Sequence, residues 1–177
     1  MSVQLLSSSG GSTDEPVPLA RAEAVLCDMD GTLVDSSAVV ESMWSPAIHE
    51  RFAREEIVRT AGRMAEIPGA AALVTALIEV GVPLALVTSA PIELMRVRME
   101  EAGVPIPSVV VSADDVERGK PDPDAYLMAA ELLGMPIASC LVLEDAASGY
   151  IAAQRAGAQI LLVGDGVPEA DPSTPRI

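Results

Sequence analysis

The sequence repeats a short apolar run followed by a longer segment of helical character, and this repetition constrains the fold more than any other feature. Apolar runs of this kind occupy 24–27, 84–87, 109–111, 140–143 and 160–163. Continuous apolar runs without alternation suit strands that are buried on both faces of a sheet. Helices are expected between them, near 69–80, 91–102, 123–134 and 147–156. The repetition predicts an α/β fold, a doubly wound parallel sheet with helices on both faces.

The chain of 177 residues fits one ordinary domain. Residues 1–20 are rich in Ser, Gly and Pro and show no periodicity, so we expect a flexible N-terminal tail followed by a core domain over 21–177. Residues 33–67 interrupt the repetition, because they hold no strand pattern and contain the lone Trp44 and the lone Phe52.

Composition excludes several classes of partner. The formal net charge is −15, and aromatic residues make up 2% of the chain. Such a charge repels nucleic acids and anionic membranes, and so few aromatic side chains cannot form a base-stacking surface. Cys27 and Cys140 lie inside apolar runs and are expected to be buried free thiols. The first residues lack the features of a signal peptide, so we expect a cytoplasmic protein without a membrane partner.

Reactive polar residues follow the apolar runs, and ligands of open α/β sheets bind outside the carboxyl ends of the strands. These residues are Asp28 and Asp30, Thr88 and Ser89, Glu144 and Asp145, with Lys120 in the segment after the third run. Each alone is weak evidence, since a carboxylate after a strand is commonly a helix cap and a lysine is usually a surface group. Helix capping does not readily explain why all of these residues fall, in order, at one edge of one sheet.

These groups together can perform a specific chemistry. Carboxylates at Asp28, Asp30 and Asp145 would repel one another unless a cation lay among them. Hard oxygen ligands, without His or Cys, indicate Mg²⁺. The metal and Lys120 would make this corner of an acidic protein an anion site, where the Thr88 hydroxyl and backbone N–H groups could hold phosphate oxygens. An aspartate can then attack phosphorus as a covalent nucleophile.

Four sequence motifs resemble those of the haloacid dehalogenase superfamily of phosphatases, in the same order and over residues 24–163. They are DMDGT at 28–32, the strand-end Thr88, Lys120 in RGKPDPDAY, and EDAASGYIAAQRAG at 144–157. The DxDGT form is similar to the phosphatase and phosphomutase branch. The last two motifs are especially similar to sugar- and polyol-phosphate phosphatases, such as those for 2-deoxyglucose-6-phosphate and glycerol-3-phosphate. The resemblance implies a Rossmann-like core and a phosphoric monoester hydrolase.

The resemblance also implies a role for each motif residue. Asp28 would be the nucleophile that becomes an aspartyl-phosphate, and Asp30 would protonate the leaving alcohol and then activate water. Thr88 would bind a phosphoryl oxygen, assisted by the Ser89 backbone N–H. Lys120 would bridge the nucleophile and the phosphoryl group.

The same resemblance implies a Mg²⁺ site. Its ligands would be Asp28, the backbone carbonyl of Asp30, and Asp145. Glu144 would lie beside these ligands rather than on the metal.

The segment between the first two motifs is shorter than in relatives that carry a helical cap there. Residues 33–67 suffice for a flap and a shortened cap remnant. Because a cap normally contacts the leaving group and selects it, the identity of the substrate is the weakest inference. The first hypothesis is a Mg²⁺-dependent phosphatase of a small sugar or polyol phosphate. The second is an open-site phosphatase acting on a larger substrate such as a phosphoprotein, or closed by a partner subunit in a homo-oligomer. The third is a non-catalytic phosphate-binding domain.

Overall fold

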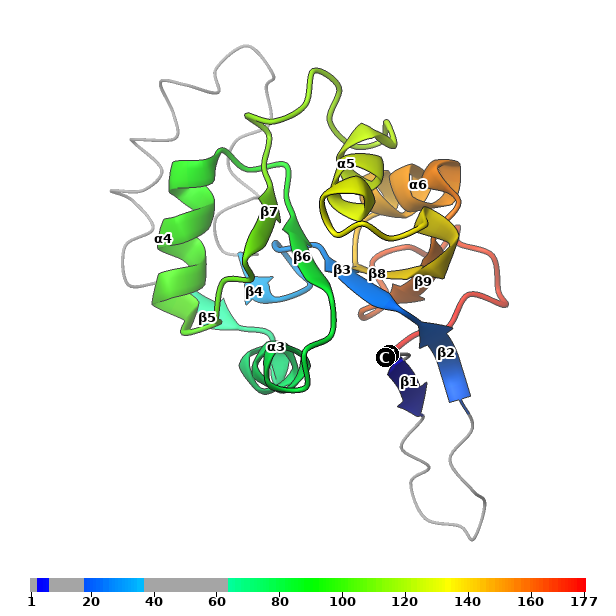
Figure 1. Ribbon diagram of the computed structural model, residues 1–177, viewed down its shortest axis with the longest axis horizontal. Coiled ribbons are helices and arrows are strands. Elements are labelled where there is room, and N and C mark those ends of the chain that lie inside the picture. Colours follow the sequence, from blue (N-terminus) through cyan, green and yellow to red (C-terminus); the bar gives the residue numbers. More distant parts are fainter. Residues whose placement is uncertain (1–2, 7–17, 37–63) are drawn as a thin grey trace, which may run out of the picture.

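A five-stranded parallel sheet forms the centre of the computed structural model, which describes residues 3–6, 18–36 and 64–177 (Figure 1). Its strands are β3 (Ala24–Cys27), β6 (Leu84–Val87), β7 (Val109–Val111), β8 (Cys140–Glu144) and β9 (Gln159–Leu162). All neighbours pair in parallel, in the order β7-β6-β3-β8-β9. The chain therefore winds outward in both directions from β3, and the predicted doubly wound α/β sheet is confirmed.

Helices cover both faces of this sheet. They are α3 (Ala70–Glu79), α4 (Ile92–Ala102), α5 (Asp124–Leu132) and α6 (Ala147–Ala156), with a short 3-10 turn, η2, at Ile137–Ser139. Successive residues of β3 point to opposite faces. Val25 and Cys27 pack in the cluster that holds the buried side chains of α3 and α4, whereas Ala24 and Leu26 pack with those of α5 and α6. Every residue of β3 is therefore apolar, which is why the strand reads as a continuous run.

Two helices end at glycines that adopt the left-handed conformation. Gly103 caps α4 with φ 69° and Gly157 caps α6 with φ 83°. A side chain is strained at such angles, so glycine is favoured there. The helix boundaries expected near residues 102 and 156 follow from this signal.

The expectation of a flexible tail over 1–20 is wrong for two segments. Strand β1 (Val3–Leu6) pairs antiparallel with β2 (Pro18–Ala22), and one residue separates β2 from β3. Gln4 and Arg21 interrupt these two strands, so neither is a continuous apolar run in the sequence, and each strand is stabilised by pairing with the other. Pro18 is the first residue of its strand, where its missing N–H is tolerated.

A second correction concerns residues 33–67, where no strand was expected. Strands β4 (Val34–Asp35) and β5 (Ala65–Glu66) pair antiparallel within this segment. Two-residue strands carry no detectable period, so the sequence pattern could not predict them. Residues 37–63 lie outside the described residues, and with them lie the predicted cap remnant, Trp44 and Phe52.

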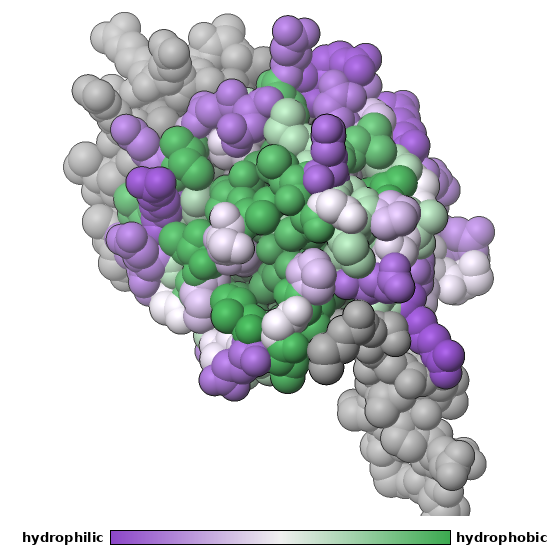
Figure 2. Space-filling view, in the orientation of Figure 1, coloured by the Kyte–Doolittle hydropathy of each residue, from purple (hydrophilic) through white to green (hydrophobic). Residues whose placement is uncertain are grey.

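Apolar side chains gather in the middle of the face drawn in Figure 2, and hydrophilic ones surround them. Within the described residues, the exposed large apolar side chains belong to three separate parts of the chain: Ile78, Val80, Leu127, Leu132 and Ile177. Among the described helices, none combines the length and the apolar character that a membrane span needs.

Candidate active site

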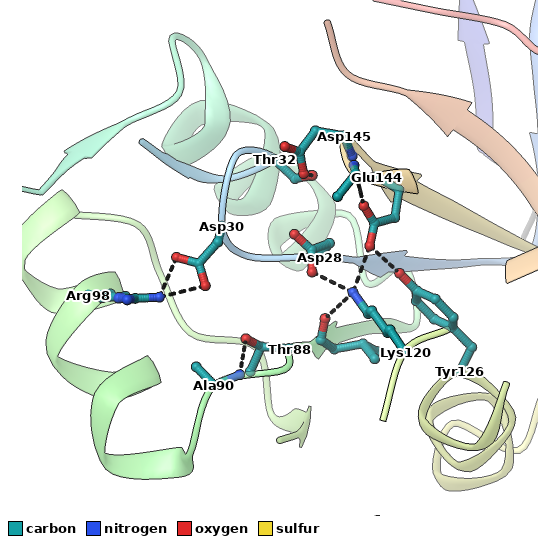
Figure 3. A network of polar contacts seen from close by, with 12 residues as sticks. Asp28, Asp30, Thr32, Thr88, Ala90, Arg98, Lys120, Tyr126, Glu144 and Asp145 are labelled. Carbon is teal, nitrogen blue, oxygen red and sulfur yellow. Dashed lines mark hydrogen bonds and ion pairs between the residues drawn. The ribbon is translucent and has the colours of Figure 1, made fainter. Parts of the chain in front are cut away.

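The carboxyl ends of three neighbouring strands bring the predicted site residues together. Strand β3 leads into Asp28, β6 leads into Thr88, and β8 ends at Glu144, which Asp145 follows. Because β6, β3 and β8 are adjacent and parallel, these residues meet at one edge of the sheet, and Figure 3 shows them facing a common centre. The edge expected from the sequence is thus the edge at which the polar groups converge.

The ammonium group of Lys120 lies at the centre of this cluster. Its Nζ is 2.5 Å from Oδ1 of Asp28, 2.7 Å from Oε1 of Glu144 and 3.2 Å from the carbonyl oxygen of Val87. Only 4% of the lysine side chain is exposed, so these contacts form in a site that is nearly shielded from water. A buried ammonium between two carboxylates is held in one position, ready to contact an anion that approaches Asp28.

Glu144 is buried, and both of its carboxylate oxygens accept hydrogen bonds from the protein. Oε1 accepts bonds from Lys120 and from the hydroxyl of Tyr126, the latter at 3.1 Å. Oε2 accepts bonds from the backbone N–H groups of Asp145 and Ala146, each at 2.9 Å. These four donors occupy about as many positions as a carboxylate offers. The arrangement supports the expected place of Glu144 beside the metal ligands.

Three carboxylates at this edge are close enough to hold a metal ion. Asp28, Glu144 and Asp145 each offer an oxygen, and these oxygens lie within 4.8 Å of one another. Asp145 also accepts a hydrogen bond from the Thr32 hydroxyl at 3.1 Å, which orients its carboxylate. With the oxygens of Glu144 already bonded, Asp28 and Asp145 are the side chains best placed to bind a hard cation such as Mg²⁺.

The pKa values of the buried carboxyl groups and of Lys120 are also consistent with a cation-binding site. Burial raises the pKa of Asp28 well above its usual value, and the neighbouring Glu144 raises it further. Burial and Glu144 likewise raise the pKa of Asp145 to about 6. Burial alone would lower the pKa of Lys120, but Asp28, Tyr126 and Glu144 outweigh it, and the pKa lies well above its usual value. The raised pKa values mean that the ionised carboxylates are unfavourable in this buried cluster, and a bound divalent cation would favour them.

Thr88 and Ser89 lie at the end of β6. The buried Thr88 hydroxyl oxygen accepts a hydrogen bond from the Ala90 N–H at 3.0 Å, and its own proton has no acceptor within the described residues. That proton can therefore be donated to a phosphoryl oxygen. Ser89 is exposed at the same edge.

The close turn after Asp28 depends on Gly31. This residue has φ 85°, and a Cβ here would overlap the carboxylate of Asp145. A side chain at position 31 would therefore be strained and would displace a proposed metal ligand.

Asp30 is the one predicted site residue whose side chain points away from the cluster. Its carboxylate contacts Arg98 on α4, and it is not part of the group of close carboxylates (Figure 3). The expected metal contact of Asp30 is its backbone carbonyl, which does not depend on this orientation, and the acid and base role expected of its side chain stays a prediction.

Sequence reasoning missed two residues of the site, Arg98 and Tyr126. Both are buried, and each contacts a predicted site residue. Arg98 lies four residues after Leu94 on the buried face of α4, and a charged residue on an apolar face is a signal that could have indicated it. Tyr126 lies within the lysine motif, and its ring is 4.9 Å from Nζ of Lys120.

Comparison with known proteins identifies the family. The model of the haloacid dehalogenase-like hydrolases matches residues 50–157, more than half of the chain, including Thr88, Lys120 and Asp145. Hexitol phosphatase A of Escherichia coli is 35% identical over 194 residues, which cover 89% of this chain and 88% of that protein. Glycerol-1-phosphate phosphohydrolase 2 of Saccharomyces cerevisiae is 27% identical over 85% of this chain and 78% of its own length.

A solved structure shows the same similarity. A haloacid dehalogenase family hydrolase of Deinococcus radiodurans, with bound phosphate and sodium, superposes with a TM-score of 0.66 and is 25% identical, with 80% of each chain covered. The chain belongs to the haloacid dehalogenase-like hydrolases. The predicted enzyme class, a phosphatase, is confirmed at the level of this family and its named phosphatase relatives.

Proposed function

We propose that this protein hydrolyses a small sugar or polyol phosphate, with Mg²⁺ as cofactor and an aspartyl-phosphate on Asp28 as intermediate. The observation that carries the proposal is the contact of Lys120 with both Asp28 and Glu144, next to the carboxylate of Asp145. This arrangement supports the proposal, because it brings together a carboxylate that could act as the nucleophile, a fixed positive charge and oxygens that could bind a metal. Phosphoryl transfer requires these three kinds of group.

In the first step, a carboxylate oxygen of Asp28 attacks phosphorus and the bond from phosphorus to the ester oxygen breaks. The carboxyl of Asp30 gives its proton to the departing oxygen, so the product alcohol leaves neutral. Lys120, which contacts Asp28, and the Thr88 hydroxyl, which lies at the same edge of the sheet, hold the phosphoryl oxygens through the transfer. The step leaves Asp28 covalently bound to the phosphoryl group.

In the second step, water attacks the phosphorus of the aspartyl-phosphate. The carboxylate of Asp30 accepts a proton from this water, and the bond from Asp28 to phosphorus breaks. Inorganic phosphate forms, and both aspartates regain the states in which they began the cycle.

The residues that would hold Mg²⁺ are Asp28, Asp145 and the backbone carbonyl of Asp30. Bound there, the ion would compensate the negative charge of the phosphoryl group and of the two carboxylates. Glu144 would position Lys120 and the backbone of Asp145 through the hydrogen bonds described above.

The proposed substrate class rests on the relatives and on the sequence motifs. Hexitol phosphatase A and glycerol-1-phosphate phosphohydrolase 2 are named for phosphates of small polyols. The alignment with the hexitol phosphatase extends over 194 positions, more than the 177 residues of this chain, so that relative has residues without a counterpart here. A cap shortened between the first two motifs, as the sequence predicts, would account for this difference and would make the site less selective.

The experiment that tests the proposal is a phosphate-release screen with and without Mg²⁺. The panel contains hexose phosphates, hexitol phosphates, glycerol phosphates and a phosphopeptide. We expect release from the sugar and polyol esters only when Mg²⁺ is present, and none with the Asp28→Asn variant. Release from the phosphopeptide alone would replace the proposed substrate with a phosphoprotein, and no release from any ester would favour a non-catalytic phosphate-binding domain.

A further inference from the structure

Tyr126 is the largest fully buried side chain within the described residues, and it lies in the first turn of α5. It packs in the same apolar cluster as Leu26 of β3, Val87 of β6 and Ala129 of its own helix. A hydroxyl in such surroundings is costly unless it forms a hydrogen bond. The partner of this hydroxyl therefore indicates what the polar end of Tyr126 does.

That partner is the carboxylate of Glu144. The Tyr126 hydroxyl donates a hydrogen bond of 3.1 Å to Oε1, and the ammonium of Lys120 donates one of 2.7 Å to the same oxygen. Two backbone N–H groups hold the other oxygen, Oε2. Oε2 thus anchors the carboxylate at one end, while Tyr126 and Lys120 fix the direction of Oε1 (Figure 3).

The ring of Tyr126 also lies against the ammonium, with Nζ of Lys120 4.9 Å from the ring centroid. A ring face at this distance attracts a cation, most strongly where water is excluded. Nζ has three printed acceptors, on Asp28, Glu144 and Val87, which equal the three donors of an ammonium. A phosphoryl oxygen therefore competes with one of these acceptors, and the Tyr126 hydroxyl leaves Oε1 with a donor while it does.

We propose that Tyr126 is a positioning residue that holds the ammonium of Lys120 for binding of the phosphoryl group. It acts through Glu144 and through the contact of its ring with Lys120, it does not touch the substrate, and the proposal rests on the function proposed above. Phenylalanine at this position would retain the ring and its packing but would remove a donor from a buried carboxylate. Because hydrogen bonds to charged groups are stronger than neutral ones, this loss should be measurable.

The test compares phosphate binding with metal binding in Tyr126→Phe. Titration calorimetry measures the Kd of inorganic phosphate in saturating Mg²⁺ and the Kd of Mg²⁺ without phosphate. We expect the Kd of phosphate to rise by about fivefold or more, and kcat/KM for p-nitrophenyl phosphate to fall by about tenfold or more. The Kd of Mg²⁺ should change by less than about threefold, because Tyr126 is bonded to neither Asp28 nor Asp145.

The other tyrosine of the chain, Tyr150 on α6, provides a matched control. It is also buried, it belongs to a different apolar cluster, and its hydroxyl accepts a hydrogen bond of 3.1 Å from the Asp171 N–H. Tyr150→Phe therefore removes the same hydroxyl without affecting Lys120, and it should change neither the Kd of phosphate nor kcat/KM by more than about twofold. Chemical denaturation of both variants shows how much stability each hydroxyl contributes.

A second measurement needs no variant at Tyr126 and serves if Tyr126→Phe does not fold. The wild type is labelled with 3-fluorotyrosine, so its two tyrosines give two fluorine NMR signals, which Tyr150→Phe assigns. Inorganic phosphate added at saturating Mg²⁺ should shift the signal of Tyr126 and leave that of Tyr150 in place.

Three outcomes would overturn the positioning role while leaving the proposed function intact. They are an unchanged Kd of phosphate in Tyr126→Phe, an equal rise in Tyr150→Phe, and a Tyr126 fluorine signal that does not move when phosphate binds. A wild-type protein that neither binds phosphate nor hydrolyses p-nitrophenyl phosphate in Mg²⁺ would instead overturn the proposed function, and the role of Tyr126 with it.

Discussion

Gly149 on α6 lies directly against the carboxylate of Glu144. A Cβ at position 149 would overlap Oε1, the oxygen that accepts hydrogen bonds from Lys120 and Tyr126. The glycine is therefore part of the reason that this buried carboxylate can reach the lysine. The contact joins the end of β8 to the first turn of α6, two elements that follow each other in the chain.

Gly149→Ala should lower both stability and activity. In a helix, alanine is favoured over glycine by roughly 0.5–1 kcal/mol, so propensity alone predicts a gain. The overlap with Glu144 should outweigh this gain and cost about 1–3 kcal/mol of the free energy of unfolding. The displaced carboxylate should release Lys120, and kcat/KM should fall by about tenfold or more.

Chemical denaturation and steady-state kinetics would measure both effects. Gly119→Ala is the control, because a Cβ there meets no atom within 4 Å although the position adjoins Lys120. An alanine at position 149 that raises stability and leaves kcat/KM unchanged would contradict the importance of this contact.

The stability of the metal-free protein should decrease as the pH rises from about 4 to about 6. The pKa of Asp145 is raised from 3.8 to about 6 in the folded protein, and that of Asp28 is raised in the same direction. Over this interval the folded state binds more protons than the unfolded state, so raising the pH favours unfolding. Other carboxylates also titrate here, so the Asp145→Asn variant provides the comparison and should show a weaker decrease.

Mg²⁺ should reverse this pH effect. A bound divalent cation stabilises the folded state by mass action, and its binding must displace the protons held by the carboxylates. The rise in melting temperature caused by Mg²⁺ should therefore be larger near pH 8 than near pH 5, and it should be lost in Asp145→Asn. Thermal melts with EDTA or with millimolar Mg²⁺ provide the measurement. A metal effect of equal size at both pH values would argue against binding by Asp145.

Asp28→Asn should abolish hydrolysis while the protein stays folded. The amide has nearly the shape of the carboxylate but is a poor nucleophile. Lys120 keeps its ion pair with Glu144 in this variant, so the protein should stay folded in EDTA, which circular dichroism can check. Beryllium fluoride, a mimic of the aspartyl-phosphate, should attach to the wild type alone, as fluorine NMR can detect. Full activity in this variant would rule out the covalent mechanism.

Lys120→Met should destabilise the protein strongly in the absence of metal. Removing the ammonium leaves Asp28 and Glu144 as buried carboxylates without their shared cation, and breaking a buried ion pair costs about 3–5 kcal/mol. Added Mg²⁺ should recover part of this stability but not the activity, since the contact to the phosphoryl group is lost. Denaturation in EDTA and in Mg²⁺ separates the two effects, and the exposed Arg96→Met serves as control. An unchanged free energy of unfolding in EDTA would contradict the pairing.

The reduced segment between the first two motifs predicts poor discrimination among small phosphate esters. A full cap contributes contacts to the leaving group that are realised in the transition state. Without it, phosphate binding should survive better than turnover or selectivity, and inorganic phosphate should inhibit modestly. We expect kcat/KM values across a dozen esters to lie within about a thousandfold of one another. A larger preference for one ester in a protein whose solution mass is that of a monomer would count against this prediction.

The sequence by itself determined the sheet and the location of the site. Strands such as β3 and β8 are buried on both faces, so nearly every residue is apolar and the pattern is visible without any partner. Parallel neighbours align their carboxyl ends, so the polar residues that follow the strands had to meet at one edge. Asp28, Lys120 and Asp145 could therefore be assigned to one site before their contacts were known.

Only the tertiary structure decided which groups pair within that site. Glu144 and Lys120 are 24 positions apart, and Arg98 and Asp30 are 68 positions apart. No local pattern encodes such pairs, because they depend on how segments that are far apart in the sequence pack together. The strands β1, β2, β4 and β5 escaped prediction for a related reason. Each contains a polar or charged residue, so none is a continuous apolar run, and each is stabilised by a partner strand whose hydrogen bonds form only when the chain is folded.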